Sequence, residues 1–249
     1  MDFDALVAAN PSITNINSVD IGQTINIPAG GAIVVTGFSS ATQESAFLWN
    51  RFGATDGPMS ATYQRLAHIL GMGEGNYESY NTGTRRVRGG VLGHSYTNRP
   101  VGTVTGRTIN QILSTDSLPG TNRKRMFAVG AYQITIPTLR NAVAAMNLTG
   151  DELLTPRLQD QIFEHYLVPT AGDGALGRFM TSGAGTVDQA QFAAAQQWAS
   201  IAVPAGYRTQ RDAISNGMMS YYGGPANRAN LNETQALRSL LSNLKQLGH

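Results

Sequence analysis

Hydrophobic residues recur at helical spacing in several stretches of the chain. Over 61–70 the apolar side chains follow the i, i+3, i+4, i+7 spacing of a buried helix face: Tyr63, Leu66, Ala67 and Leu70. Similar periodicity, helped by capping residues or prolines at helix starts, predicts further helices over 109–114, 138–146, 157–168, 188–202 and 232–247. We therefore expect a mainly α-helical chain of the α+β class.

Two regions have the composition or alternation of β-structure instead. Residues 79–106 are rich in Gly, Asn, Thr and Arg, which is typical of turns and short strands. Nearer the N-terminus, 24–28 alternates apolar and polar residues and predicts a strand, and 32–35 is a candidate edge strand. A short helix capped by Asp4 is expected to end at Asn10, because Pro11 follows.

The N-terminal pattern divides the chain into three expected parts. The short helix, the Asp-Ile-Gly-Gln turn at 20–23 and the strand that follows resemble the second half of a LysM module, a family that binds N-acetylglucosamine polymers. The first strand and first helix of that module are missing from the sequence. The segment is therefore a remnant, a boundary within a longer chain, or a piece packed on the next domain. We expect this partial LysM-like segment over 1–29, a linker over 30–42 and a helical domain over 43–249.

Composition excludes several classes of function. With no cysteine, the chain forms no disulfide and no cysteine-based zinc site, and its four histidines are scattered, so we expect no metal or cofactor. The net charge of +2 is too small to indicate nucleic acid as a partner. No apolar run approaches the roughly 18 residues that indicate a membrane span. A monomer is expected.

One carboxylate stands in a setting that suits acid catalysis. Glu74 follows an apolar helical run and precedes Gly75, which permits close approach of backbone or substrate. A half-buried carboxyl there would have the raised pKa that protonation of a glycosidic oxygen requires. The alternative is a surface glutamate past a helix end, and the local sequence alone favours it. A downstream Gly-Ala-Tyr-Gln element at 130–133 reverses that preference.

Taken in order, the motifs resemble those of the lysozyme superfamily, which cuts peptidoglycan. The similarity covers roughly 60–210 and includes muramidase domains of phage and bacteria and the lambdoid phage lytic transglycosylases. The motifs are Glu74-Gly75, 79–81, 108–113, 127–134, 148–156, Gln159-Asp160 and 197–200 before 204–206. The resemblance implies a lysozyme-like fold with a small β or loop lobe after Glu74. It also implies cleavage of the MurNAc-GlcNAc β-1,4 bond of peptidoglycan glycan strands.

The resemblance also implies roles for individual residues. Glu74 is the expected catalytic acid, and Tyr132 and Gln133 are expected to line the glycan groove, where the Gln133 amide can bind an acetamido group.

Residues just after Glu74 are further candidates for substrate binding. Ser79, Tyr80 and Asn81 are expected to line the cleft, although Tyr80 could equally pack inside the β lobe. Glu78 would pair with Glu74 if the helix continued. The Asn, Ser and Gly content favours a loop instead, with Glu78 as a structural hydrogen-bonding residue.

Two positions depart from the family pattern. Ala131 stands where many relatives have arginine, so a cationic contact is missing or comes from Arg85, Arg86 or Arg88. Gln111 stands where relatives often have glutamate, which favours a mechanism with a single acid. Attack by water would make the chain a hydrolase, which the whole-domain pattern favours. Attack by the MurNAc 6-hydroxyl would make it a lytic transglycosylase that leaves 1,6-anhydro ends.

Other functions stay open at this point. A wall-binding or virion structural module with the same fold would commonly lose Glu74, which is present here. A chitinase would need a second carboxylate, for which only Glu78 is near in sequence. The N-terminus lacks the basic region of a signal peptide, although the substrate lies in the periplasm or the extracellular wall. We therefore expect a phage-released, virion-borne or secretion-system-delivered protein.

Overall fold

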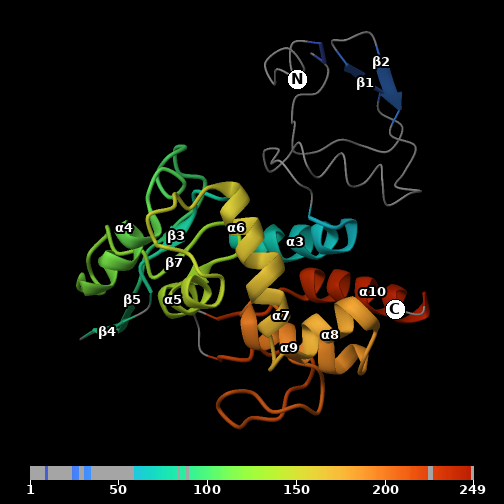
Figure 1. Cartoon of the computed structure of the whole chain (residues 1–249). Helices are drawn as coiled ribbons and strands as arrows, with labels where there is room; N and C mark the ends of the chain where they lie inside the picture. The colour runs from blue at the N-terminus through green and yellow to red at the C-terminus, as the bar shows by residue number, and fades with distance from the viewer. Residues whose placement is uncertain are drawn as a thin grey trace. The chain divides into compact units, whose positions relative to one another are not determined.

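The computed structural model describes residues 9–10, 24–27, 31–34, 59–83, 85–87, 90–223 and 227–247 (Figure 1). The chain divides into two compact units, Met1–Gly53 and Ala54–His249. The predicted helix that Asp4 caps falls outside the described residues, apart from its last positions. The expected start of the helical domain near 43 also falls outside them.

The described part of the first unit contains a hairpin. Strand β1 (Thr24–Ile27) pairs antiparallel with β2 (Gly31–Val34), which confirms both predicted strands and places β2 within the stretch expected to be a linker. Buried Asn10 accepts a hydrogen bond from the Asn26 backbone N–H at 2.6 Å and donates to the Asn26 carbonyl at 2.8 Å. Its amide therefore pairs with β1 much as a neighbouring strand would.

The second unit is built mainly from helices. These are α3 (Ala61–Glu74), α4 (Ile109–Ser114), α5 (Ile136–Ala145), α6 (Pro156–Ile162), α7 (Val168–Thr170), α8 (Ala175–Ser182), α9 (Val187–Gln197) and α10 (Leu231–Gln246). A 3₁₀ turn, η1 (Thr115–Ser117), follows α4, and a π-helical turn, η2 (Phe163–Leu167), joins α6 to α7. The predicted helices are confirmed, except that α9 ends at Gln197 rather than continuing to 202. The sequence pattern did not predict α8.

A small antiparallel sheet accompanies the helices. Its strand order is β6 (Ser95–Tyr96), β3 (Tyr80–Asn81), β7 (Ala128–Val129) and β8 (Ile134–Thr135). Strands β4 (Arg85–Val87) and β5 (Gly90–Leu92) form a separate hairpin. Short strands were predicted over 79–106 and are confirmed there. The second unit is thus a mixture of helices and a small antiparallel sheet, in agreement with the α+β class.

At one end of this unit lie the sheet and helices α4 and α5, and at the other end lie α8, α9 and α10 (Figure 1). Helices α3 and α6 run between the two ends. The core is continuous across them because Phe163, which is fully buried, stacks on Tyr132 at 4.3 Å between ring centroids and lies 5.8 Å from the ring of Trp198. Among the described residues, no helix has the length and apolar character needed to cross a bilayer.

Helix α3 carries the candidate acid at its last position. Ser60 caps its first turn by accepting a hydrogen bond from the Tyr63 N–H, and Leu66 and Leu70 are fully buried on one face. The helix runs on through two glycines, so Glu74 is its final residue rather than the residue after its end. Gly75 then leaves the helix at φ +111°, a conformation that favours glycine.

Candidate active site

The structure brings the two motifs of the sequence side by side in the sheet. Strand β3, which follows Glu74, pairs with β7, which leads into a turn formed by Gly130, Ala131, Tyr132 and Gln133 (the 130–133 turn). The Gly130 N–H donates to the Ser79 carbonyl at 2.7 Å. The Asn81 amide donates to Gln133 Oε1 at 2.8 Å. These contacts join segments that are far apart in the chain.

A short loop, 75–79, connects Glu74 to the sheet and has its own hydrogen bonds. Asn76 Oδ1 accepts from the Glu78 N–H at 3.0 Å and from the Ser79 hydroxyl at 3.1 Å, and the Asn76 N–H donates to Ser79 Oγ at 2.9 Å. Ser79 is 1% exposed. It therefore shapes the loop from inside, which corrects the expectation that its side chain contacts substrate.

Asn81 and Gln133 form the polar part of the candidate groove. Both side chains are half-buried, and Gln133 adopts a left-handed backbone at φ +46° at the end of the turn. Its Nε2 donates to the Gly130 carbonyl at 3.0 Å, while Asn81 Oδ1 accepts from the Gly83 N–H at 2.9 Å. Each side-chain amide has two N–H donors, so both keep capacity to bind a further acceptor.

Tyr132 lies on the core side of the same turn. It is 4% exposed, its ring stacks on Phe163, and its hydroxyl donates to Asp160 Oδ1 at 2.6 Å. The ring supports the turn from beneath and offers no face to a sugar, which corrects the expectation that Tyr132 lines the groove. An aromatic after two small residues in a turn can point to either side. The buried ring of Phe163 draws it inward.

Tyr80 packs within the sheet, one of the two roles expected for it. Its ring stacks on Tyr96 at 4.7 Å between centroids, directly across the β3–β6 pair, and its hydroxyl donates to the Arg123 carbonyl at 3.2 Å. The side chain is half-buried, so part of its surface still faces outward.

Glu78 acts as the acceptor for a neighbouring loop. It is 5% exposed and accepts hydrogen bonds from the N–H groups of Gly102 (3.0 Å), Val104 (2.7 Å) and Thr105 (3.2 Å) and from the Thr105 hydroxyl. Burial alone would raise the pKa of Glu78, but these hydrogen bonds outweigh it and hold the pKa below its ordinary value. These hydrogen bonds agree with the structural role that the loop composition favoured for Glu78. They correct its inclusion among the substrate-binding candidates, because its carboxylate is fully engaged.

Replacing Glu78 by Gln is expected to lower the free energy of unfolding by about 1–3 kcal/mol at pH 7, because an amide N–H₂ would face backbone donors. Since the folded-state pKa of Glu78 is lowered, its contribution is present above the ordinary glutamate pKa and is lost as the pH falls through the folded-state value. Urea denaturation at pH 7 and pH 3 checks both statements. An equal difference between native chain and variant at the two pH values would contradict them.

Two residues of α6 complete the site, and the sequence indicated them only through family resemblance. Gln159 is fully buried and its Oε1 accepts from the Ala131 N–H at 3.0 Å. Its Nε2 donates to the carbonyls of Tyr77 (3.1 Å) and Leu154 (3.0 Å). One side chain thus connects the 75–79 loop to the 130–133 turn. No local pattern marks a glutamine for this role, because its partners are backbone groups distant in sequence.

Asp160, the next residue, connects the same two segments through side chains. Its Oδ1 accepts from the Tyr77 hydroxyl at 2.8 Å and from the Tyr132 hydroxyl at 2.6 Å. Burial raises the pKa of Asp160 to about 6, because it outweighs the two phenol hydrogen bonds, and the nearby Glu164 carboxylate adds to the rise.

Gly130 fits so closely against Gln159 that an added Cβ would force the Gln159 side chain to move. It adopts φ +76°, and a Cβ there would lie 1.9 Å from Gln159 Oε1. Gly130→Ala is therefore expected to destabilise the chain by about 3 kcal/mol or more, from left-handed strain plus displacement of Gln159. Gly206 is the matched control, because it has φ +85° with nothing within 4 Å of its Cβ position. Gly206→Ala should cost only the strain, about 1–2 kcal/mol. Equal losses in chemical denaturation would show that the contact with Gln159 is unimportant.

Two positions differ from the motifs of the lysozyme superfamily that the sequence resembles, Gln111 and Ala131. Gln111 completes a capping box at the start of α4: its N–H donates to Thr108 Oγ1, and its Oε1 accepts from the Thr108 N–H at 2.9 Å. Its amide is thus occupied at a helix end. Arg85 and Arg86 belong to β4, and Arg88 lies outside the described residues, so the source of a cationic contact stays a prediction.

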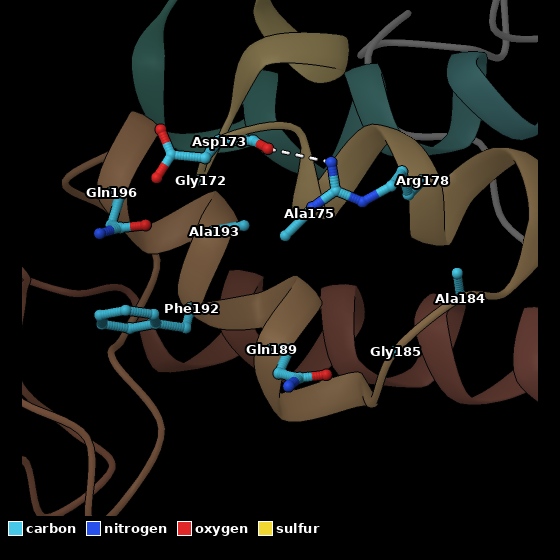
Figure 2. A pocket seen from close by; sticks show the side chains of 10 residues that line it. All are labelled: Gly172, Asp173, Ala175, Arg178, Ala184, Gly185, Gln189, Phe192, Ala193 and Gln196. Carbon is cyan, nitrogen blue, oxygen red and sulfur yellow. Dashed lines mark hydrogen bonds between the residues drawn. The ribbon is translucent and has the colours of Figure 1, made fainter.

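A separate pocket opens at the other end of the unit, between α8 and α9 (Figure 2). It has a volume of about 380 Å³, and Arg178 on its wall donates to the Asp173 carbonyl at 3.0 Å. Phe192, Gln189 and Gln196 line its α9 side. None of the predicted site residues lines it. In the described ranges, no group of three or more His, Asp or Glu side chains gathers to hold a metal ion.

We compared the chain with known families, curated proteins and solved structures. No family model, curated protein or solved structure matches the chain. The functional conclusion therefore depends on the residues and on their arrangement.

Proposed function

We propose that the chain is a peptidoglycan-degrading glycosidase, a muramidase that cleaves the MurNAc-GlcNAc β-1,4 bond with Glu74 as general acid. The observation that carries this proposal is the pairing of β3 with β7, with its Asn81–Gln133 amide contact of 2.8 Å. It joins the segment that begins at Glu74 to the 130–133 turn, the two elements that the resemblance assigns to one glycan site. A lysozyme-like fold is part of the same proposal.

The chemistry requires a proton donor and groups that orient the sugar. Glu74 would protonate the oxygen of the leaving sugar while positive charge develops on the other ring. The amides of Asn81 and Gln133 suit the acetamido groups that both sugars of peptidoglycan carry, because an amide donates and accepts. Neutral hydrogen-bonding groups are appropriate for a polymer whose recognition elements are hydroxyls and amides.

The state of Glu78 favours a mechanism with a single acid. Its carboxylate accepts four hydrogen bonds from the 102–105 loop, so it is not available as the second carboxylate of a chitinase-type mechanism. After the glycosidic bond breaks, water or the MurNAc 6-hydroxyl would attack the anomeric carbon and give its proton to the Glu74 carboxylate. We propose the hydrolase, with the lytic transglycosylase as the alternative. Either enzyme would act where peptidoglycan lies, in the periplasm or the extracellular wall.

The proposal is tested by incubating the purified chain with Gram-negative peptidoglycan and analysing soluble products by mass spectrometry. Products with reducing MurNAc ends are expected for the hydrolase. Products lighter by one water, with 1,6-anhydro ends, would identify a lytic transglycosylase. An absence of products would overturn the enzymatic proposal for this substrate and would favour a wall-binding or virion structural module.

A further inference from the structure

We propose that Asp160 is a positioning residue whose ionised carboxylate aligns the 75–79 loop, and with it the end of α3, against the 130–133 turn. This inference rests on the proposed function, because the groups that it aligns are those assigned to glycan cleavage. It assigns to the half-buried carboxylate a role in catalysis rather than in folding.

The geometry is that of one acceptor shared by two donors. Tyr77 lies in the loop that begins directly after Glu74, and Tyr132 directly precedes Gln133. Both hydroxyls donate to the same oxygen, Asp160 Oδ1, at 2.8 and 2.6 Å. A displacement of either segment therefore lengthens a hydrogen bond to an atom that also holds the other segment.

The fold does not need this carboxylate to join the two segments. Gln159 already joins them through the Tyr77 carbonyl and the Ala131 N–H, and the β3–β7 pair joins them again. What Asp160 adds is a negative charge, which makes both phenol hydrogen bonds charge-assisted and hence shorter and stronger than neutral ones. The charge therefore fixes the positions of the Tyr77 and Tyr132 side chains more precisely.

Among the described residues, that charge has no cation paired with it, because no lysine or arginine there forms an ion pair with Asp160. Its charged neighbour is Glu164, one turn further along the same helical segment, whose like charge opposes ionisation. An asparagine would accept the same two hydrogen bonds without desolvating a charge. A half-buried, uncompensated carboxylate beside a candidate active site is typical of a functional group.

The arrangement predicts a dependence of activity on pH. Among the described residues, the titratable groups that face Asp160 are Tyr77 from the 75–79 loop, Tyr132 from the 130–133 turn, and Glu164 from its own segment. Burial raises the pKa of Tyr77 and of Tyr132, so both remain donors through the neutral range. Asp160, with its pKa raised to about 6, is then the group that changes charge. Protonation at lower pH would weaken both hydrogen bonds and loosen the site.

The test measures kcat and KM for peptidoglycan from pH 4.5 to 8 in the native chain, Asp160→Asn and Glu164→Gln. We expect an acidic limb near pH 6 in the native chain. In Asp160→Asn that limb should disappear, with kcat lower by about 100-fold and KM little changed. In Glu164→Gln the limb should persist and move to lower pH, because a like charge is removed. A native pH profile and native kcat in Asp160→Asn would overturn the proposal.

Hydrogen exchange provides a readout that does not depend on the reaction. In Asp160→Asn at pH 8, amides of the 75–79 loop and the 130–133 turn should exchange faster, whereas those of α9 and α10 should be unchanged. If the native chain proves inactive on peptidoglycan, the proposed function fails while this measurement still decides the role of Asp160. Unchanged exchange in both segments would overturn the positioning role.

Discussion

Glu74→Gln is expected to lower the rate of peptidoglycan cleavage by about 10²–10⁴-fold, the usual contribution of a general acid or base. The amide is nearly isosteric with the carboxyl but cannot deliver a proton to the leaving oxygen. The fold should not suffer, because Glu74 is the last residue of α3, where the helix dipole disfavours a negative charge. The decrease in turbidity of a peptidoglycan suspension measures the rate, and circular dichroism during thermal unfolding measures the stability.

A second glutamate provides the control for this substitution. Glu152 accepts hydrogen bonds from the N–H groups of Thr149 (2.9 Å) and Gly150 (2.8 Å), in the connection between α5 and α6. It belongs to no part of the proposed site, so Glu152→Gln should clear the suspension at close to the native rate. Native activity in Glu74→Gln would remove Glu74 from the mechanism.

Gln159→Leu is expected to lower the free energy of unfolding by about 3–6 kcal/mol, the largest effect on stability that the site predicts. The leucine would leave three buried backbone groups without the partner that Gln159 provides: the Ala131 N–H and the carbonyls of Tyr77 and Leu154. Each buried group that loses its hydrogen bond costs about 1–3 kcal/mol, and the added apolar surface offsets only part of the total. Guanidinium denaturation measures the change.

Gln159→Glu distinguishes the acceptor role of the Gln159 amide from its donor role. The acceptor for Ala131 is kept, while the donor is replaced by an oxygen that faces the carbonyls of Tyr77 and Leu154. Protonation restores a donor, so the pKa of the new carboxyl should be raised in the folded state. The variant should then be most stable at low pH and lose stability as the pH rises through that raised pKa. A variant with leucine at native stability, or a glutamate variant with the native pH dependence, would contradict the assigned role.

Much of the helical framework is predictable, because its signals are local. Leu66 and Leu70 mark the buried face of α3, and Thr108 and Pro156 mark helix starts that the structure confirms. Helix α8 was missed because it lacks such a start: Gly174 precedes it in a left-handed conformation with no side-chain cap. Helix α9 ends early because Trp198 adopts an extended backbone, with its ring in the core beside Phe163.

The site was predictable only where residues of the recognised motifs contact one another directly. The order of the motifs indicated that Asn81 and Gln133 belong to one region, and the structure brings them into contact. The inward orientation of Tyr132 depends on Phe163, and the roles of Gln159 and Asp160 depend on hydrogen bonds to distant segments. Such interactions leave no periodicity or spacing in the sequence, because tertiary packing alone determines them.

The central proposal is that the two motifs form one glycan site. The most direct test is an NMR titration of isotope-labelled Glu74→Gln with a GlcNAc-MurNAc tetrasaccharide. The substitution is expected to slow turnover, so the sugar remains intact while amide and side-chain shifts are recorded. We predict shifts at the side-chain amides of Asn81 and Gln133 together. Shifts confined to the pocket between α8 and α9, where Gln189 and Gln196 lie, or no shifts at saturating sugar, would contradict a glycan site on the sheet.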